Sequence, residues 1–403
     1  MISILSARTL GGILLTISSI DVASGASAAE PAVQAAQTAA KVRPAAAAAP
    51  SNMTYDSRVT KLPHAYQGPF VQLPGGTIVG IEANQVIRSA DGGKSWSASD
   101  VFSPEQKDKL NLSISNERAL LRTRDGTLVL GCMNLNSRRW TWDKTIHDAP
   151  GAVLATWVMR STDDGKTWID VQKLHDEWTG AVRDLIQMKS GRLVLTSMKL
   201  LHDPGRHAVL TYVSDDDGKT WMPSNLIDLG GSGHHGGVTE PSVVELADGR
   251  LWLLIRTNWG EFWSGYSVDG GRFYRTLQPS GIGASSAPGL VKRLASGRLA
   301  LAWNRPFPEG QTSYPLRGGD MEWSDVPVSN HRGELSLAFS EDDGKTWTKP
   351  VVVAREAGKS LAYPYLFEPS PGVLWLTTMQ GGVRVQFREG DLLGAGATKG
   401  ADR

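Results

Sequence analysis

The chain has 403 residues and is nearly neutral, with 42 Lys and Arg residues against 41 Asp and Glu residues. Proteins that follow a nucleic-acid backbone usually carry a basic patch or stripe, whereas the charges here are mixed along the whole sequence. Composition therefore argues against a nucleic-acid partner and favours a small molecule or a sugar. The 14 Trp residues supply material for a large aromatic-rich core.

The first 28 residues are predicted to be a signal peptide. Arg8 is the single positive charge of a segment with a short apolar run, and Ala26-Ser27-Ala28 matches the A-x-A pattern of a signal-peptidase site. An N-terminal membrane anchor is the alternative, but the apolar run is shorter than the roughly 20 residues needed to span a bilayer. We expect an exported protein, periplasmic or secreted, with no membrane span after signal removal.

The Ala/Pro-rich stretch 29–51 shows no apolar periodicity and is expected to be a disordered linker. Residues 52–392 carry the repeats described below and form the expected folded domain, and residues 393–403 are expected to be a flexible tail. Cys132 is the single cysteine, so an exported fold would have no intrachain disulfide and would depend on its core.

A short acidic motif recurs along the chain. The pattern S-x-D-x-G-x-x-W, here called the Asp box, occurs four times, and a fifth copy ends in tyrosine: SADGGKSW (89–96), STDDGKTW (161–168), SDDDGKTW (214–221), SVDGGRFY (267–274) and SEDDGKTW (340–347). Each copy follows an alternating or apolar run, which is typical of a strand entering a tight turn stabilised by Asp and Gly. Five copies spread around a fold cannot converge on one substrate, so we interpret them as turns.

Hairpin-like units alternate with these turns. Six segments read as strand, small-residue turn, strand: GPFVQLPGGTIVGI, RALLRTRDGTLVLG, RDLIQMKSGRLVLTS, PSVVELADGRLWLLIR, PGLVKRLASGRLALAW and PYLFEPSPGVLWLTT. They predict an all-β fold, a six-bladed β-propeller with four-stranded antiparallel blades and Asp-box turns. We expect residues 52–62 to close the ring by adding a strand to the last blade. Four Asp-box tryptophans are expected to be buried at the outer edge: Trp96, Trp168, Trp221 and Trp347.

The repeats also predict where a site lies. In each blade the first strand begins, the second ends and the third begins on the same face of the ring, so residues at these places converge on one end of the channel. First strands start at Gln67, Glu117, Val182, Glu240, Pro288 and Tyr363. The ends of second strands and the starts of third strands add Arg256, Asn258, Trp259, Trp303, Asn304, Arg305, His207 and Arg332. Guanidinium groups grip carboxylates bidentately, so this face suits a carboxylated sugar.

From about residue 60 to 390 the chain resembles the sialidase superfamily, which carries multiple Asp boxes on a six-unit all-β repeat. TEPSVVELADGRLWLLIRT resembles the segment with an activating glutamate and the second arginine of a carboxylate-binding triad, which map to Glu240 and Arg256. HRGELSLAFSEDDGKTW resembles the segment of the third arginine, giving Arg332, and SLAYPYLFEPSPGVLWLTT that of the nucleophilic tyrosine, giving Tyr363. The resemblance implies that the tyrosine attacks the anomeric carbon while the glutamate takes its proton.

Each of these side chains also has a purely structural interpretation. Arg256 or Arg332 could be a solvated arginine at a strand end, and Tyr363 could be a packed aromatic residue. Glu240 could form a salt bridge with one of those arginines. The Asp boxes indicate the fold and not the reaction, because non-enzymatic propellers also carry them.

Two departures from the family pattern concern the first blade. The family's first arginine stands in an R-I-P stretch, where this chain reads AYQGPFVQL with Tyr66 or Gln67 instead. The loop that would carry the acid/base aspartate is missing from TIVGIEANQVIRSADGG. We expect replacements from the second or third blade, namely Glu117, Arg118, Arg183 and Asp184. Asp184 is the expected acid/base, and a surface pair with Arg183 is the alternative interpretation.

The glycine-rich loop GGSGHHGGVTE places His234 and His235 just before Glu240. Imidazole titrates near neutrality, so either ring could face the substrate as a general acid or base, and we count His235 among the catalytic candidates. His207, in GRHAVLTYVS, is the next candidate by position. A metal site is the alternative, but adjacent histidines rarely bind one ion and no spaced third ligand is obvious, so we expect no metal and no other cofactor.

Three classes of function are compatible with these residues. We favour an exo-acting glycoside hydrolase of the exo-α-sialidase type, which cleaves a terminal sialic-acid-like or other acidic sugar. A polysaccharide lyase is the second class, in which Tyr363 and a histidine perform β-elimination on a uronate-containing glycan. The third is a non-catalytic, carbohydrate-binding propeller. The sugar, its linkage and the oligomeric state are left open.

Overall fold

The computed structural model describes residues 52–393. The predicted signal peptide and linker lie outside these residues, as does the predicted tail after Leu393. In the described part nearly all regular structure is strand, and the helices are short: α1 (Pro104–Leu110), the 3-10 turn η1 (Leu135–Ser137) and α2 (Glu389–Leu392). Within residues 52–393 no helix is long and apolar enough to cross a membrane.

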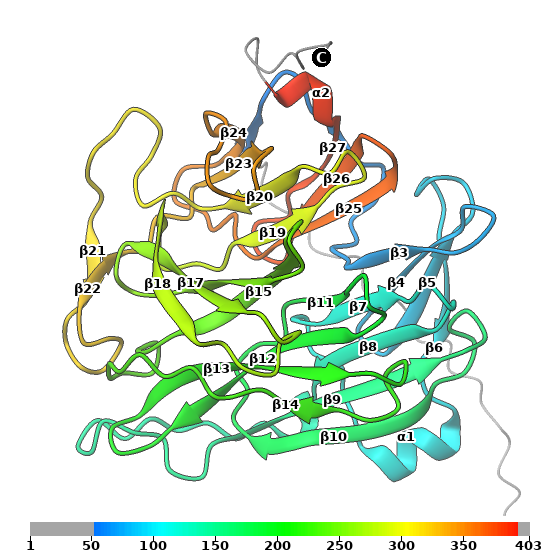
Figure 1. Cartoon of the computed structure of the whole chain (residues 1–403), viewed down its shortest axis with the longest axis horizontal. Helices are drawn as coiled ribbons and strands as arrows, with labels where there is room; N and C mark the ends of the chain where they lie inside the picture. The colour runs from blue at the N-terminus through cyan, green and yellow to red at the C-terminus, as the bar shows by residue number, and fades with distance from the viewer. Residues whose placement is uncertain (1–51, 394–403) are drawn as a thin grey trace, which may run out of the picture. The chain divides into compact units, whose positions relative to one another are not determined.

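Six antiparallel sheets form the predicted six-bladed propeller (Figure 1). The first three blades each pair four strands in chain order. Blade 1 contains β3 (Phe70–Gln72), β4 (Ile78–Glu82), β5 (Gln85–Ser89) and β6 (Ser97–Asp100). Blade 2 contains β7 (Ala119–Arg122), β8 (Leu128–Met133), β9 (Val153–Ser161) and β10 (Ile169–Glu177). Blade 3 contains β11 (Leu185–Gln187), β12 (Leu193–Leu201), β13 (Arg206–Ser214) and β14 (Met222–Pro223).

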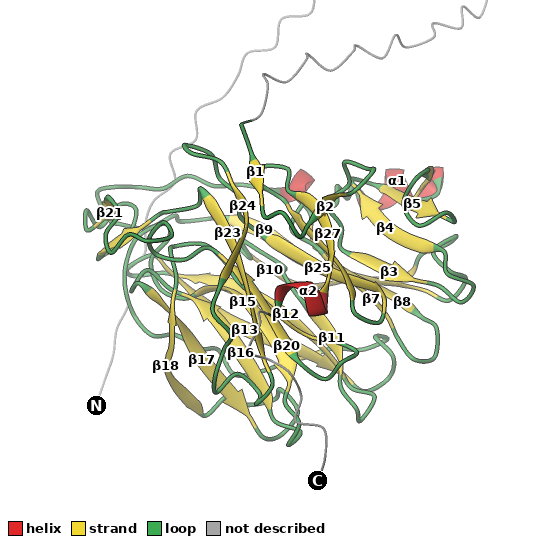
Figure 2. Cartoon of the chain, turned by 90° about the horizontal axis from the view of Figure 1, so that it is seen from above, coloured by secondary structure: helices red, strands yellow, loops and turns green. Residues whose placement is uncertain are grey.

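The remaining blades contain an insertion and the ring closure. Blade 4 contains β15 (Thr239–Glu245), β16 (Leu251–Arg256), β17 (Glu261–Ser267) and β18 (Thr276–Gly283). Blade 5 contains β19 (Leu290–Arg293), β20 (Leu299–Trp303), β23 (Glu334–Ser340) and β24 (Val351–Arg355). Blade 6 contains β25 (Pro364–Ser370), β26 (Val373–Thr378), β27 (Arg384–Arg388) and β2 (Thr60–Lys61). A separate hairpin stands out beside the blades in both views (Figures 1 and 2), namely β21 (Leu316–Gly318) and β22 (Pro327–Ser329).

The ring closes as the sequence predicted. Strand β2 pairs antiparallel with β27, with Thr60 opposite Gln386, and so completes blade 6. A second strand, β1 (Thr54–Tyr55), pairs with β24 and gives blade 5 a fifth strand, which the sequence did not predict. The segment that starts the domain therefore covers the outer edges of two adjacent blades, which protects strand edges from non-native pairing.

The first strands of the blades surround the middle of the molecule, and their neighbours lie outward (Figure 1). Central strands are packed on both faces by adjacent blades. Strand β16, for example, reads LWLLIR, and all six of its residues are buried. Because both faces are covered, such strands are apolar runs rather than alternating sequences. The packed blades thereby fix the strand starts that carry the candidate site residues.

The Asp boxes form tight turns, as predicted. In the copy of blade 5, Asp342 accepts hydrogen bonds from the Ser340 hydroxyl, the Thr346 backbone N–H and the Thr346 hydroxyl, at 2.7 to 2.9 Å. The Gly344 N–H donates to the Ser340 hydroxyl at 2.8 Å, and Gly344 has a φ of 82°, which favours glycine. The bonds of Asp342 thus close within the eight residues of the turn, whereas the neighbouring Asp343 accepts from the Ala247 N–H at 2.9 Å and pairs with Arg293, both outside the turn.

The Asp-box tryptophans differ from the prediction in their burial. Trp168 is 1% exposed, as expected, and lies in the core shared by blades 1 and 2, where Gln106 of α1 donates to its carbonyl at 2.8 Å. Trp96, Trp221 and Trp347 are half-buried. Each donates its indole N–H to the glycine carbonyl of its own turn at 3.0 to 3.2 Å, which holds the ring beside the surface turn.

Candidate functional site

Two candidate residues share an uncommon backbone conformation. Glu240 lies at the start of β15 and Tyr363 directly before β25, and each is followed by a proline, Pro241 or Pro364. Their φ angles are 48° and 64°, a region that costs a non-glycine residue about 1–3 kcal/mol. At Glu240 the pairing of β15 with β16 also shifts register, which re-aims the side chain. Both strand starts therefore depart from regular β-structure where the candidate pair stands.

The side chains of Tyr363 and Glu240 are in direct contact. The Tyr363 hydroxyl donates to Glu240 Oε1 at 3.0 Å, as their equivalent strand starts predicted. Each residue is 8% exposed. Burial, together with the negative charge of Glu240, raises the pKa of Tyr363 above its ordinary value. At neutral pH the phenol is therefore protonated and faces a carboxylate.

The ionisation of Glu240 depends on its arginine neighbours. Burial alone would raise the pKa of Glu240, but the charge and the hydrogen bond of Arg256 act against it. The charges of Arg183 and Arg332 add to this effect, so that the pKa lies below its ordinary value of 4.5. Glu240 is thus an ionised base under the conditions in which Tyr363 is an acid.

Arg256 is held by a chain of hydrogen bonds. It donates to Glu240 Oε2 at 2.5 Å and to the Ser286 hydroxyl at 2.8 Å, and it is 3% exposed. Ser286 in turn donates to the Asn258 side chain at 2.6 Å, and Asn258 donates to the His235 carbonyl at 2.7 Å. The salt bridge that was the structural alternative for Glu240 therefore exists, and it coexists with the contact to the phenol.

Arg183, which precedes β11, also belongs to this cluster. Its guanidinium carbon lies 5.2 Å from the centre of the Tyr363 ring and 4.9 Å from that of Tyr365. It donates to the Pro364 carbonyl at 3.0 Å and is 3% exposed. The third blade thus supplies a guanidinium to the site, as the sequence suggested for the missing first arginine.

Arg332 approaches the same ring from the segment before β23. Its guanidinium carbon lies 5.7 Å from the centre of the Tyr363 ring. It donates to the Gln380 side chain at 3.2 Å and to the Ser286 carbonyl at 2.5 Å, and the residue is half-buried. Arg332 is therefore more accessible than Arg183 or Arg256. In all three the Nε–H is buried without a hydrogen-bond partner among the described residues.

Arg118 and Gln67 lie near the cluster but are engaged in the scaffold. Arg118 is completely buried and donates to the Glu82 carboxylate at 3.0 Å and to the Ser115 carbonyl at 3.2 Å. Gln67 donates to the Asn116 carbonyl at 2.8 Å. The structure therefore does not present Arg118 to a ligand, because its guanidinium has no exposed surface.

Glu117, which precedes β7, differs from these neighbours in having a free carboxyl group. The residue is half-buried, and within residues 52–393 its side chain makes no hydrogen bond or ion pair. Burial and the negative charge of Glu240 raise the pKa of Glu117 to about 7, although Arg183, Arg256 and Arg138 act in the opposite direction. Its charge also raises the pKa of Tyr363, so Glu117 lies close enough to the cluster to act on it electrostatically.

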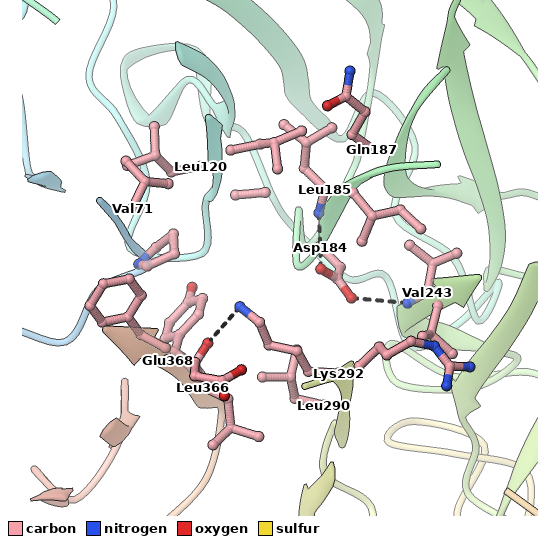
Figure 3. Close-up of a pocket in the computed structure, with 18 of the residues that line it drawn as sticks. Val71, Leu120, Asp184, Leu185, Gln187, Val243, Leu290, Lys292, Leu366 and Glu368 are labelled. Carbon is pink, nitrogen blue, oxygen red and sulfur yellow. Dashed lines mark hydrogen bonds between the residues drawn. The ribbon is translucent and has the colours of Figure 1, made fainter. Parts of the chain in front are cut away.

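Asp184 does not join the cluster. Its carboxylate accepts hydrogen bonds from the Ser242 hydroxyl at 2.7 Å and the Val243 N–H at 3.0 Å. It lines a cavity of about 630 Å³ in the central channel, together with Lys292 (Figure 3), and neither Glu240 nor Tyr363 lines that cavity. Neighbouring residues of an extended segment point to opposite sides, so the strand start that aims Arg183 at Tyr363 turns the Asp184 carboxylate elsewhere. It does not form the surface pair with Arg183 either.

The histidines surround the site without forming a metal centre. The ring of His235 lies 4.5 Å from that of His234 and stacks on Trp323 at 5.3 Å. Burial and then the charge of Arg256 lower the pKa of His235, and burial lowers that of His207 to about 4. His207 is 4% exposed and bonded to the His234 carbonyl at 2.9 Å. Within the described residues no group of three or more His, Cys, Asp or Glu side chains could hold a metal ion.

Three further candidates contact other parts of the fold. Trp259 packs edge-on against Trp263, with ring centres 5.3 Å apart. Arg305 donates to the Ser336 hydroxyl at 3.1 Å. Asn304 is fully buried and donates to the Leu361 carbonyl at 3.0 Å, so it holds the segment that leads to Tyr363 without touching the cluster itself.

Sequence reasoning missed three residues of the site. Ser286 bonds to both Arg256 and Arg332 and lies two residues before Pro288. The search for residues at the first position of each first strand would have found it if the residues just before that position had been included. Gln380 follows β26 and binds Arg332. Arg138 is exposed, lies 5.9 Å from the Trp178 ring and follows η1, in an irregular loop for which no repeat predicts a direction.

Comparison with known proteins gives consistent matches. A family model described as a BNR repeat-like domain matches residues 75–375. The sialidase of Micromonospora viridifaciens is 25% identical over 331 residues, a match that covers 74% of this chain and 47% of that protein. The chain thus spans about half the length of this relative.

Solved structures that share the fold include two glycoside hydrolases. The Hadza microbial sialidase Hz136 gives a TM-score of 0.55 at 18% identity and covers 81% of this chain and 67% of that chain. The GH93 α-L-arabinofuranosidase of Fusarium graminearum gives a TM-score of 0.53 at 14% identity and covers 84% of this chain and 100% of that chain. At these identities the likeness establishes the propeller and leaves the chemistry to the site.

Proposed function

We propose that this chain, which belongs to the BNR repeat-like domain family and is a divergent sialidase-like propeller, is an exo-acting glycoside hydrolase of the sialidase type. The hydrogen bond between Tyr363 and Glu240, 3.0 Å long and surrounded by three guanidinium groups, carries this proposal. A buried phenol paired with an ionised carboxylate is the arrangement that activates a tyrosine as a nucleophile. Both residues also sit at strained strand starts, which cluster at active sites.

In this mechanism the Tyr363 hydroxyl attacks the anomeric carbon of the terminal sugar. Because the pKa of Tyr363 is raised, a free phenolate is not available at neutral pH, and the proton must move to Glu240 during the attack. The charges of Arg183, Arg256 and Arg332 stabilise negative charge that develops on the phenol oxygen. The product of this step is a covalent glycosyl-tyrosine, which water then hydrolyses.

The proposed substrate carries a terminal sialic-acid-like or other acidic sugar. Its carboxylate would pair first with Arg332, the most accessible guanidinium of the cluster, because Arg183 and Arg256 are each 3% exposed. Arg256 is already bound to Glu240 and Ser286, and its one donor without a partner, the Nε–H, is buried. We also propose that the enzyme is exported, on the strength of the A-x-A site and apolar run at the start of the sequence.

A substrate panel tests the reaction. The full chain is incubated with 4-nitrophenyl glycosides of a sialic acid, a uronic acid and arabinofuranose, and with uronate polysaccharides. We expect nitrophenol release from an acidic glycoside, no new ultraviolet absorbance from the polysaccharides, and no release by the Tyr363→Phe variant. A rise in absorbance would instead identify a lyase, and saturable binding without turnover would identify a binding protein.

A further inference from the structure

The proposed hydrolysis requires an acid that the Tyr363–Glu240 pair does not supply. Breaking the glycosidic bond leaves an electron pair on the departing oxygen, and an alcohol leaves readily only if it receives a proton as the bond breaks. Tyr363 is the nucleophile in this scheme, and Glu240 is ionised so that it can take the phenolic proton. A further group must therefore carry the proton for the leaving oxygen.

The other titratable groups around the cluster do not meet this requirement. Asp184 is bound to Ser242 and Val243 on the wall of the channel cavity (Figure 3). His207 and His235 have lowered pKa values and are neutral at pH 7, so neither holds a proton with suitable acidity there. Arginine side chains remain protonated throughout. The half-buried, unpartnered carboxyl group of Glu117 is left.

Tyr365 ties the backbone around Glu117 to the strand of the nucleophile. Its hydroxyl lies 3.3 Å from the Asn116 carbonyl and 3.2 Å from the Arg118 carbonyl, the residues on either side of Glu117. The Ser115 hydroxyl donates to the Glu117 carbonyl at 2.5 Å. Tyr365 follows the nucleophile by two residues, so the same strand start fixes both the phenol and the segment that carries the free acid.

We propose that Glu117 is the general acid that protonates the leaving oxygen, and the general base in the step that follows. This inference rests on the proposed function. In the first step the bond from the Tyr363 oxygen to the anomeric carbon forms and the glycosidic bond breaks. The leaving oxygen keeps the bonding electron pair and takes the proton of Glu117, while the phenolic proton passes to Glu240.

The second step restores the enzyme. Water attacks the anomeric carbon and gives a proton to the Glu117 carboxylate, and the bond to the Tyr363 oxygen breaks. The phenolate takes its proton back from Glu240. The net reaction is a glycoside plus water giving a free sugar plus an alcohol. A pKa of about 7 allows Glu117 to alternate between its acid and base forms near neutral pH.

Dependence on the leaving group tests this role. A 4-nitrophenyl glycoside needs little protonation to leave, whereas the methyl glycoside of the same sugar needs it fully. For Glu117→Gln we expect kcat/KM on the methyl glycoside to fall by about 100-fold or more, and on the 4-nitrophenyl glycoside by less than about 10-fold. The wild-type fall in activity above about pH 7 should also disappear in this variant.

Two variants control the experiment. Glu245→Gln removes a carboxylate at the other end of the channel-facing strand β15 and should leave the ratio of the two rates unchanged. Glu117→Asp keeps an acid on the same backbone and should retain both the fall at high pH and most of the activity on the methyl glycoside. If Glu117→Gln fails to fold, as judged from its Tm, the aspartate variant still reports on the role.

Each outcome decides the matter. Equal losses on both glycosides, with the high-pH fall intact, would overturn the role of Glu117 and leave the proposed hydrolase standing. A wild-type protein that hydrolyses none of the glycosides would overturn the proposed function, and the role of Glu117 with it. Persistence of the high-pH fall in Glu117→Gln would assign that ionisation to another group and would likewise overturn the role of Glu117.

Discussion

The Asp-box turns and the cluster around Tyr363 both contain an acid, hydrogen-bond donors and an aromatic ring. They differ in how far apart along the chain the hydrogen-bond partners lie. Asp342 receives its hydrogen bonds from residues within four positions along the chain. Glu240 and Tyr363 are 123 positions apart, and their contact exists only when the ring of blades is closed. The key acid of the turn is thus satisfied locally, whereas the contact of Glu240 with Tyr363 depends on the whole fold.

The two regions also differ in where backbone strain lies. In the Asp box of blade 5 the positive φ angles belong to Asp343 and Gly344, residue types that tolerate them. In the cluster they belong to Glu240 and Tyr363, residue types for which they are costly. Three arginines with unpaired Nε–H groups surround Glu240 and Tyr363, whereas the Asp box of Asp342 contains no arginine. The turns therefore stabilise the fold, while the fold holds the cluster in a conformation it would not adopt alone.

The sharpest test of this contrast is Tyr363→Phe. Removing the nucleophilic oxygen should lower kcat by about 1,000-fold or more, while the free sugar still binds, because the ring and the surrounding guanidiniums remain. Turnover is measured on whichever glycoside the panel identifies, and binding by calorimetry. Tyr266→Phe, on the outer strand pair of blade 4, removes a hydroxyl elsewhere and should leave kcat unchanged. Undiminished turnover in Tyr363→Phe would remove the phenol from the chemistry.

Glu240→Gln should have the next largest effect. The amide keeps the shape of the side chain but cannot accept the phenolic proton, so we expect a loss in kcat of about 100-fold. In the wild type, activity should persist down to about pH 4.5 or below, because the pKa of Glu240 lies under its ordinary value and only the ionised form is active. An acid limb near pH 7 would indicate that a different base is used.

Arg256→Ala should weaken substrate binding and also move that acid limb. Loss of a charge-assisted hydrogen bond costs roughly 1.5–3 kcal/mol, equivalent to an increase in KM of about 10- to 150-fold. Without this guanidinium, burial dominates at Glu240 and its pKa rises, so activity should be lost at a higher pH as the solution is acidified. Arg298→Ala, which removes a surface partner of Glu341, serves as the control. An unchanged pH profile would show that Arg256 does not set the ionisation of Glu240.

The sequence predicted the blades because their signals are local. The pattern of a hairpin and the pattern of an Asp box can each be recognised within about 16 consecutive residues. The Asp box occurs five times, which strengthens the signal. Glu240, Tyr363, Arg256 and Arg332 were identified from position and resemblance, and the structure brings them together.

Other features depend on geometry that single segments do not encode. The Asp184 side chain points away from the cluster because of the local twist of its strand start. The position of the adjacent Arg183 does not predict this. Pairing of β1 with blade 5 depends on the path of a short irregular segment. The free carboxyl group of Glu117 becomes distinct only when Arg118 is seen to be paired with Glu82 instead. For Arg183 and Asp184, and for Glu117 and Arg118, two side chains next to each other in sequence have different surroundings, and the alternatives could not be separated without the fold.

The smallest expected effect belongs to the turns. Asp342→Ala removes the acceptor of three hydrogen bonds in one Asp box, and we expect Tm to fall by roughly 2 to 4 °C, which is the scale for losing about 1 kcal/mol in a large domain. Turnover should not change, because the turn lies between the outer strands of blade 5 and shares no hydrogen bond with the cluster. Asp125→Ala, in an exposed hairpin turn of blade 2, should leave both quantities unchanged. If Asp342→Ala lowered kcat at a temperature well below its Tm, the turns and the cluster would be coupled, and the independence of the two regions would have to be abandoned.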